Sequence, residues 1–211
     1  MNKEITFNID DNVFNIFTSK EIDISKYYEL NQIHSNKVLI VDNNYQNNSI
    51  GDAMITNLKD KKLVIKTADC IPILLYDKEH KVIALIHSGW KGTINNIVNN
   101  TVKQMINNYN SKSQNIKAYI YPSIRQCHFE VEEDVYKLFR NKIKNIDKYT
   151  IKKENKYLID LQSIIKNQLK EIKINNIYDS GICTYCNHHE FYSYRYNHTE
   201  KRNYLIAMIK E

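Results

Sequence analysis

The sequence predicts an α+β protein with a mixed β-sheet, folded as a single compact domain over residues 1–211. Short apolar runs of strand length are mixed with longer segments of helical periodicity, and several predicted strands follow one another directly. That order favours α+β over a doubly wound parallel fold. With four glycines, two prolines, and no repeat or linker-like stretch, nothing divides the chain.

The predicted strands are apolar runs bounded by polar or turn residues. EITFNID and VFNIFT predict an N-terminal hairpin, because Asp10-Asp11-Asn12 supplies a turn between them. The segments at 62–67, 71–77 and 81–87 are typical of buried strands. Further strands are expected at 37–42, 116–122, 176–182, 191–195 and 203–209.

Three segments have the i, i+3, i+4 spacing of an amphipathic helix. The first runs from Ile94 to Tyr109, with Thr93 as its expected N-cap. The others lie near 132–146 and 160–172. Each places apolar side chains on one face, so we expect each to pack on the sheet.

Composition narrows the possible partners. The net charge of +6 comes from lysines spread along the chain, whereas nucleic-acid-binding proteins usually cluster their charge. No stretch has the ~18 apolar residues of a membrane span, and the N-terminus lacks the apolar core of a signal peptide. We expect a cytoplasmic monomer or weak oligomer that acts on a small molecule, with its four cysteines reduced.

A cysteine and a histidine are predicted to lie opposite each other across a β-hairpin. If Lys78-Glu79 is a two-residue loop between the strands at 71–77 and 81–87, Cys70 stands directly opposite His87. Their Cβ atoms would then lie about 5 Å apart, close enough to share a metal ion. Lys-Glu is not a favoured hairpin dipeptide, and a loop one residue longer would spoil the pairing.

The sequence allows three interpretations of Cys70 and His87. With His34, the pair would give zinc three protein ligands and leave a fourth position open, as in catalytic zinc sites. A lone cysteine near an apolar strand is also commonly a small core residue, and a lone histidine a hydrogen-bonded one. A third reading makes Cys70 a thiolate nucleophile activated by His87, which would cleave an amide.

Five motifs in order resemble one known family. They are QIHS at 32–35, ADCIP at 68–72, HSGWKG at 87–92, YPSIRQCHFEVEEDV at 121–135 and CTYCNHHEFYSYRYNHTEKR at 183–202. Together they resemble the YfiH-type family, variously named multicopper polyphenol oxidoreductase (laccase-domain), peptidoglycan editing factor and purine nucleoside phosphorylase. The resemblance covers roughly residues 31–209.

The resemblance implies β-sheets packed between helices, and zinc held by His34, Cys70 and His87. It also implies phosphorolysis of adenosine, inosine and methylthioadenosine, with adenosine deamination beside it. Copper-dependent phenol oxidation and amide hydrolysis in a peptidoglycan precursor are the alternative activities. A single Cys-His-His set lacks the ligands of several copper centres, so zinc is the expected cofactor and copper less so.

Other candidate site residues lie in the same motifs. Asp69 is expected to orient a ligand or exchange a proton, so the predicted catalytic residues are His34, Cys70, His87 and Asp69. The alternative for Asp69 is a strand-end carboxylate satisfied by backbone amides. Gln32 is expected either to contact the substrate or to hold the loop around His34.

Cations are expected to hold phosphate. Lys91 opens the first helix beside Gly89, Gly92 and Thr93, where backbone amides attract anions. The alternative is that the glycines only allow a tight turn. Ser193 and Arg195 are expected on a strand at 191–195, and Arg195 and Arg202 are candidates for binding phosphate bidentately.

The chain departs from the family pattern at several positions. Ser35 and Tyr121 replace glycines, Lys91 replaces an arginine, and Lys201 replaces a glycine. The family's early Arg-Gly-Gly and Asn-Leu segments are not recognisable in FTSKEIDIS at 17–25. We therefore expect no nucleoside contact of that kind from this region.

A rival metal site is possible in the last motif. Cys183, Cys186, His188 and His189 are packed closely in sequence and include a C-x-x-C pair. Structural zinc sites usually need a second such pair, and no partner for His128 is apparent.

The remaining function class is a non-catalytic interaction protein. Such a protein is expected to have an exposed apolar helix face or a basic stripe, and the sequence shows neither.

Overall fold

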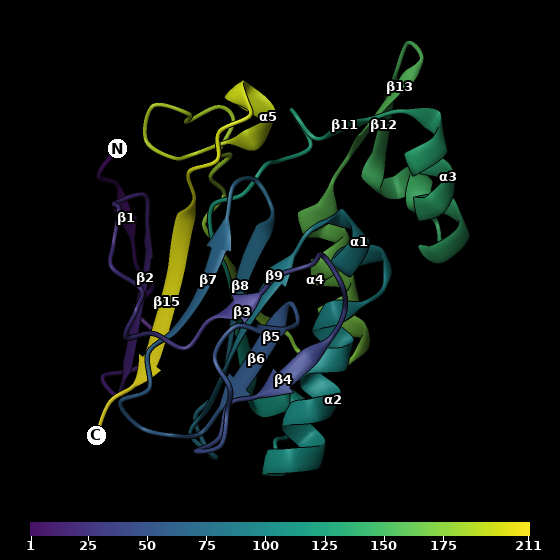
Figure 1. Cartoon of the computed structure of the whole chain (residues 1–211). Coiled ribbons are helices and arrows are strands. Elements are labelled where there is room, and N and C mark those ends of the chain that lie inside the picture. The colour runs from purple at the N-terminus through teal and green to yellow at the C-terminus, as the bar shows by residue number, and fades with distance from the viewer.

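A six-stranded mixed sheet forms the centre of the fold in the computed structural model, which describes residues 1–211 (Figure 1). Its order is β14-β10-β8-β9-β6-β4. The bounds are β14 (Asn176–Asp179), β10 (Ile116–Ile120), β8 (Ile71–Asp77), β9 (Val82–Ser88), β6 (Ala53–Thr56) and β4 (Val38–Ile40). β8 and β9 are central, and all their residues are buried.

A four-stranded sheet brings the two ends of the chain together. Its order is β1 (Glu4–Ile5), β2 (Val13–Thr18), β15 (Asn203–Ile209) and β7 (Leu63–Thr67), all antiparallel. Two small sheets complete the strands: β3 (Leu30–Asn31) with β5 (Ser49–Ile50), and β13 (Lys156–Ile159) between β11 (Glu130–Val131) and β12 (Thr150–Lys153). The predicted N-terminal hairpin is present, with a shorter first strand.

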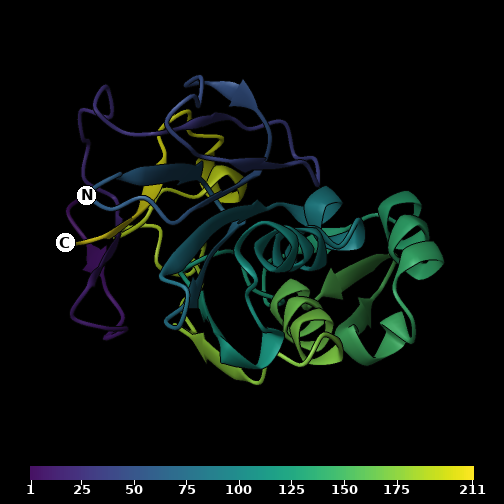
Figure 2. The same cartoon turned by 90° about the horizontal axis from the view of Figure 1, so that it is seen from below.

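The helices are α1 (Trp90–Ile94), α2 (Ile97–Tyr109), α3 (Glu133–Lys142), α4 (Leu161–Glu171) and α5 (Tyr194–Asn197), with 3-10 turns at Ser113–Asn115 and Ile146–Tyr149. Helices α1, α2 and α4 lie beside the six-stranded sheet, as Figure 2 shows from below, whereas α3 packs with the small sheet that contains β13. The structure confirms the α+β class with mixed sheets. No helix has both the length and the apolar character needed to cross a membrane.

Two apolar clusters lie on opposite faces of the six-stranded sheet. On one face, alternate residues of β8 and β9 such as Ile73 and Ala84 pack with Val98, Ile165 and other residues of α2 and α4. On the other face, Leu74 and Leu85 pack with Phe17, Leu205 and other residues of the four-stranded sheet. Because both faces of β8 are covered, its sequence is almost continuously apolar, which is why it is easy to predict.

The hairpin register differs from the predicted one. Asp77 pairs with Val82, so the loop between β8 and β9 has four residues, and Pro72 rather than Cys70 stands opposite His87. The loop is two residues longer than expected. A shift by two keeps side chains on the same face of a strand, whereas a shift by one reverses them. Cys70 and His87 are therefore diagonal neighbours and still lie close together.

Two other local predictions are wrong. The first helix is divided into α1 and α2, so Thr93 lies inside α1 and its hydroxyl donates to the carbonyl of Gly89 (3.1 Å) rather than capping. The segment 191–195 is not a strand. The Ser193 hydroxyl caps α5 by accepting from the N–H of Tyr196, and the backbone N–H of Arg195 donates to Asp69 instead of to a neighbouring strand.

A buried polar cluster joins the N-terminal hairpin to the central sheet. The side chain of Asn15 in β2 accepts from the N–H of Phe7 and donates to its carbonyl, both at 2.9 Å. The hydroxyl of the fully buried Tyr121 donates to the same amide oxygen at 2.8 Å. Because the N–H and carbonyl of Phe7 bond to the Asn15 side chain, they do not form ladder bonds with β2, which explains why β1 ends at Ile5.

Asn15→Ala should lower the free energy of unfolding more than Tyr121→Phe. The first change leaves the buried Tyr121 hydroxyl and the Phe7 backbone without partners, at about 1–3 kcal/mol for each lost partner. The second removes one donor and should cost about 1 kcal/mol. Urea denaturation measures both, with the exposed Asn44→Ala as control. Equal losses in the two variants would contradict this account.

Candidate active site

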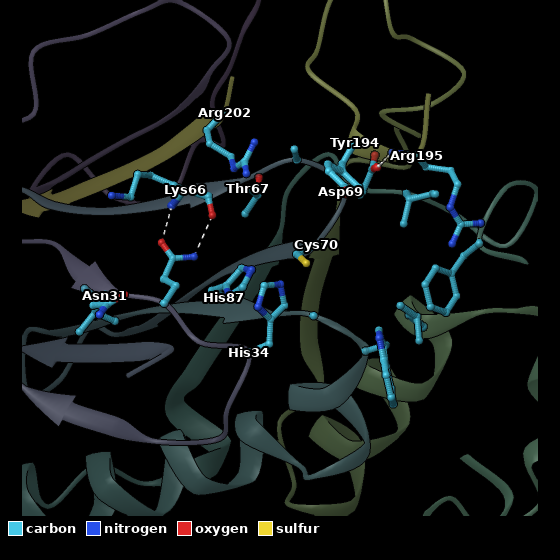
Figure 3. Close-up of a pocket in the computed structure, with 18 of the residues that line it drawn as sticks. Asn31, His34, Lys66, Thr67, Asp69, Cys70, His87, Tyr194, Arg195 and Arg202 are labelled. Carbon is cyan, nitrogen blue, oxygen red and sulfur yellow. Dashed lines mark hydrogen bonds between the residues drawn. The ribbon is translucent and has the colours of Figure 1, made fainter. Parts of the chain in front are cut away.

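A cavity of about 750 Å³ opens between the two large sheets and the helix starts. Its walls come from 19 residues, none of them before Leu30. Seven of the residues singled out from the sequence line it, and Figure 3 shows several of them pointing toward a common centre: Gln32, His34, Asp69, Cys70, His87, Arg195 and Arg202. Ile124 and Phe129 of the motif at 121–135 also line it, so the structure brings together residues from all five motifs.

His34, Cys70 and His87 form one compact donor group. Their ligand atoms all lie within 4.8 Å of one another, and the two imidazole rings stand nearly perpendicular with centroids 4.9 Å apart. His87 is the penultimate residue of the central strand β9, Cys70 immediately precedes β8, and His34 comes from the loop after β3. His34 and Asp69 both have left-handed backbones (φ 59° and 87°), an uncommon conformation that is frequent at functional sites.

Gly89 is required by the closeness of this group. A Cβ at this position would lie 2.8 Å from Cδ2 of His34 and 3.1 Å from Sγ of Cys70. A Cβ at Gly92 would approach the carbonyl of Ser35 at 3.2 Å. Since α1 has only five residues, close approach explains both glycines better than an anion site at the helix start.

Asp52 is the functional residue that the sequence did not reveal. Its fully buried carboxylate accepts from Nδ1 of His87 (2.9 Å) and from the backbone N–H groups of His34 (2.9 Å) and Ser35 (2.6 Å). The Ser35 hydroxyl also donates to it at 2.6 Å. With Nδ1 held, Nε2 of His87 is left to face the cavity, which is how proteins orient metal-binding histidines.

The charges in the group are strongly coupled. Although burial favours the neutral acid, hydrogen bonds from His87 and Ser35 lower the pKa of Asp52 to about 2. Burial opposes ionisation of Cys70, but the neighbouring His87 and His34 lower its pKa to about 6. Burial also disfavours charged His87, yet Cys70 and Asp52 raise its pKa to about 9. At neutral pH the site thus favours a thiolate, the form that binds metal or attacks an electrophile.

Gln32 and Asp69 connect the segments around the cavity. The Gln32 amide donates to the carbonyl and accepts from the N–H of Lys66, both at 2.8 Å, which fixes the loop before His34 (Figure 3). The Asp69 carboxylate accepts from the hydroxyl of Thr184 and the N–H of Arg195, both at 2.7 Å. Asp69 therefore anchors the C-terminal motif, beside its predicted part in catalysis.

Three cations line the cavity. Arg202 and Lys66 lie on one side, and Arg195 lies beyond Asp69 on the other (Figure 3). Lys66 is paired with Glu29 at 2.7 Å. The other predicted substrate residues are not part of the lining: Lys91 is exposed with Nζ 5.6 Å from the Trp90 ring centre, and Ser193 is buried as the cap of α5.

The rival cluster has a different composition from the predicted one. Cys183 and Cys186 lie with Cys127 and His128, not with His188 and His189. His188 instead stacks on Tyr196, with ring centroids 3.6 Å apart. None of the four clustered residues lines the cavity.

The family model for multi-copper polyphenol oxidoreductase laccase matches residues 4–210. The chain belongs to this family. Curated relatives include a purine nucleoside phosphorylase of Rickettsia prowazekii, 35% identical over 91% of this chain and 77% of the relative. A second, from Clostridium acetobutylicum, is 37% identical over 90% of this chain and 81% of the relative.

Solved structures of the family share the fold. The protein YfiH of Bacillus licheniformis superposes with a TM-score of 0.83 and 25% identity, covering 89% of this chain and 76% of its own. A protein of Neisseria meningitidis reaches a TM-score of 0.87 at 21% identity, over 100% of this chain and 99% of its own. The family fold thus extends over essentially all of the chain.

Asp52→Asn should weaken metal binding by His34, Cys70 and His87 about 10- to 100-fold, the usual effect of losing a carboxylate that orients a ligand histidine. The amide keeps the shape but removes the charge that favours the His87 tautomer. Competition with a chromophoric chelator measures the affinity, and the surface variant Asp42→Asn is the control. An unchanged affinity would show that Asp52 only supports the fold.

Alkylation of Cys70 in chelator-treated protein should reach half its maximal rate near pH 6. The thiolate is the reactive form, so the rate rises with pH through the pKa, whereas an ordinary thiol would reach half-maximum near 9. Mass spectrometry of the peptide that contains Cys70 separates it from the other cysteines. His87→Gln should move the midpoint upward, and a wild-type midpoint near 9 would exclude the thiolate–imidazolium pair.

Proposed function

We propose that this chain is a cytosolic, zinc-dependent purine nucleoside phosphorylase. Adenosine, inosine and methylthioadenosine are its proposed substrates, with phosphate as the second substrate and the chain acting as a monomer or weak oligomer. The observation that carries the proposal is the His34–Cys70–His87 group on the wall of a cavity of about 750 Å³. Cavities of this size hold small molecules, and relatives aligned over nine-tenths of the chain are named for this activity.

The donor set fits zinc. Two imidazoles and a thiolate are ligands that zinc prefers, and a zinc ion held by three protein ligands would keep a fourth position for water or substrate. Nδ1 of His87 is already held by Asp52, as expected for a histidine that binds metal through Nε2. One such group does not provide the several sites of a multicopper oxidase, so zinc is preferred to copper despite the family's name.

The cavity offers separate surfaces for a base and for phosphate. Its apolar wall includes Trp90, Ile124, Phe129 and Leu161, which suit the flat face of a purine. Arg202 donates from Nη1 to the carbonyls of Thr199 and Lys201, both at 2.9 Å, so its remaining N–H groups are available to an anion. A guanidinium held in this way binds phosphate without further ordering.

In phosphorolysis, a phosphate oxygen forms a bond to the anomeric carbon while the bond from that carbon to the purine nitrogen breaks. The purine leaves with the electron pair and takes up a proton. Zinc, when bound, supplies Lewis acidity to an oxygen or nitrogen of the substrate. Arg202 and Lys66 hold the attacking phosphate, and fixed charges of this kind need no rearrangement during the reaction.

Zinc-loaded protein should consume adenosine only when phosphate is present, and should release adenine and ribose 1-phosphate. Chromatography of the products with and without phosphate measures this. Inosine formed equally fast without phosphate would replace the proposal by deamination. Inactivity on nucleosides with hydrolysis of a peptidoglycan-precursor amide, or copper-dependent oxidation of a phenol, would replace it by the corresponding activity.

Arg202→Gln should raise the KM for phosphate roughly 10- to 150-fold, since a hydrogen bond to a charged group contributes about 1.5–3 kcal/mol. Zinc content should stay unchanged. Lys66→Gln, Arg195→Gln and Lys91→Gln tested in parallel determine which cations share the role, with the exposed Lys103→Gln on α2 as control. A normal KM for phosphate in the Arg202 variant would remove this residue from the anion site.

A further inference from the structure

Three thiols and one imidazole converge outside the cavity. Cys127 and His128 follow β10 on the segment that leads to β11, and Cys183 and Cys186 follow β14. Their four ligand atoms lie within 4.8 Å of one another, although 56 residues separate Cys127 from Cys183. No bound group is needed to bring them together, because the surrounding backbone already does so: Ser123 forms a parallel β-bridge with Cys183.

The distances match a tetrahedral metal site. Sγ of Cys127 lies 3.7 Å from Sγ of both Cys183 and Cys186. Nδ1 of His128 lies 3.2 Å from Sγ of Cys127 and 3.3 Å from Sγ of Cys186. Ligands at the usual zinc–sulfur and zinc–nitrogen lengths in a tetrahedron are about 3.8 Å apart for two sulfurs and about 3.6 Å apart for sulfur and nitrogen. The two sulfur–sulfur distances agree with these values, the two sulfur–nitrogen distances are about 0.3–0.4 Å shorter, and all the donor atoms lie within 4.8 Å of one another.

A disulfide does not explain the arrangement. All four cysteines of the chain are free, and a disulfide requires sulfurs about 2.05 Å apart. Three thiols cannot pair completely. The imidazole is also held in place, because the His128 ring stacks on Tyr185 with centroids 3.9 Å apart and an angle of 19°. This stacking directs Nδ1 at the thiols, which a disulfide would not use.

We propose that Cys127, His128, Cys183 and Cys186 bind a second zinc ion, which is structural. Soft thiolates with one imidazole select zinc among the common divalent ions, and a Cys₃His set is a usual composition of structural sites. Four protein ligands leave no position for substrate. The site is separate from the group formed by His34, Cys70 and His87, with which it shares no ligand.

The position of this second site explains what it stabilises. It ties the segment that carries Phe129, a residue of the cavity wall, to the segment that carries Thr184. Thr184 donates to Asp69, and the Arg195 guanidinium donates to the carbonyls of His128 (3.0 Å) and Glu130 (2.9 Å). The ion would therefore hold one rim of the cavity, where α5 and β11 lie at the same end of the molecule (Figure 1).

Metal analysis of the purified protein tests the proposal. We expect two zinc ions per chain in the wild type, one in Cys186→Ser, one in Cys70→Ser, and none in the double variant. His188→Gln, which changes a nearby histidine outside the group, should retain two. A wild-type protein with a single zinc that Cys70→Ser removes would overturn the second site while leaving the proposed function intact.

Cobalt substitution of the wild-type protein gives a test that does not depend on a variant folding. Cobalt in a three-thiolate site should give a stronger thiolate-to-cobalt charge-transfer band than cobalt in the single-thiolate site. Titration of zinc-free protein should therefore show two spectrally distinct sites, and Cys186→Ser should lose the stronger one. One weak spectrum that saturates at one cobalt per chain, or a disulfide between Cys127 and Cys183 in freshly isolated protein, would contradict the proposal.

Discussion

The buried carboxylate of Asp52 is the constraint on which the site depends. It accepts hydrogen bonds from the ring of His87 and from the backbone of His34, so one side chain sets the positions of two of the three donors. Burying a charge of this kind is costly unless it is fully paired. The ring N–H of His87 and the N–H groups of the His34 loop provide that pairing. The left-handed backbone at His34 is therefore held by the same carboxylate that orients His87.

Two departures from the family pattern have local structural explanations. Ser35 stands where the family has glycine, and its hydroxyl adds a hydrogen bond to Asp52 that glycine cannot make. Tyr121 also stands in place of a glycine. Its ring fills the space between the two large sheets, packing against Phe7 and Phe17, and its hydroxyl reaches Asn15. Both substitutions thus add contacts rather than leave gaps.

The sequence was informative where a pattern is local. β8 has the predicted bounds because its apolar run is covered on both faces, and α4 lies within one residue of the predicted helix at each end. β6, with only the four residues Ala53–Thr56, is too short to show a period. The aromatic residues at 191–195 favour a strand, but Ser193 is instead the N-cap of α5, and the N–H of Arg195 in the first turn of this helix donates to Asp69.

The candidate site was predictable in its motifs and not in its supporting contacts. His34, Cys70 and His87 stand in motifs, whereas Asp52 is a single acidic residue before a short strand and resembles any turn residue. The predicted closeness of Cys70 and His87 is confirmed, but through a diagonal relation that the loop length did not reveal. Cys127 and His128 could not be matched to Cys183 and Cys186, because parallel pairing of β10 with β14 joins these distant segments.

The place of β15 has a consequence for the order of folding during synthesis. This strand lies between β2 and β7, so the four-stranded sheet stays divided until residues 203–209 have left the ribosome. Until then the N-terminal hairpin has no neighbour to pair with, and a lone two-stranded hairpin is only marginally stable in water. The apolar face of the central sheet that packs on it stays uncovered for the same period, which exposes the nascent chain to aggregation. Completion of the cavity wall, including Arg202 just before β15, thus also waits for this part of the chain to be synthesised.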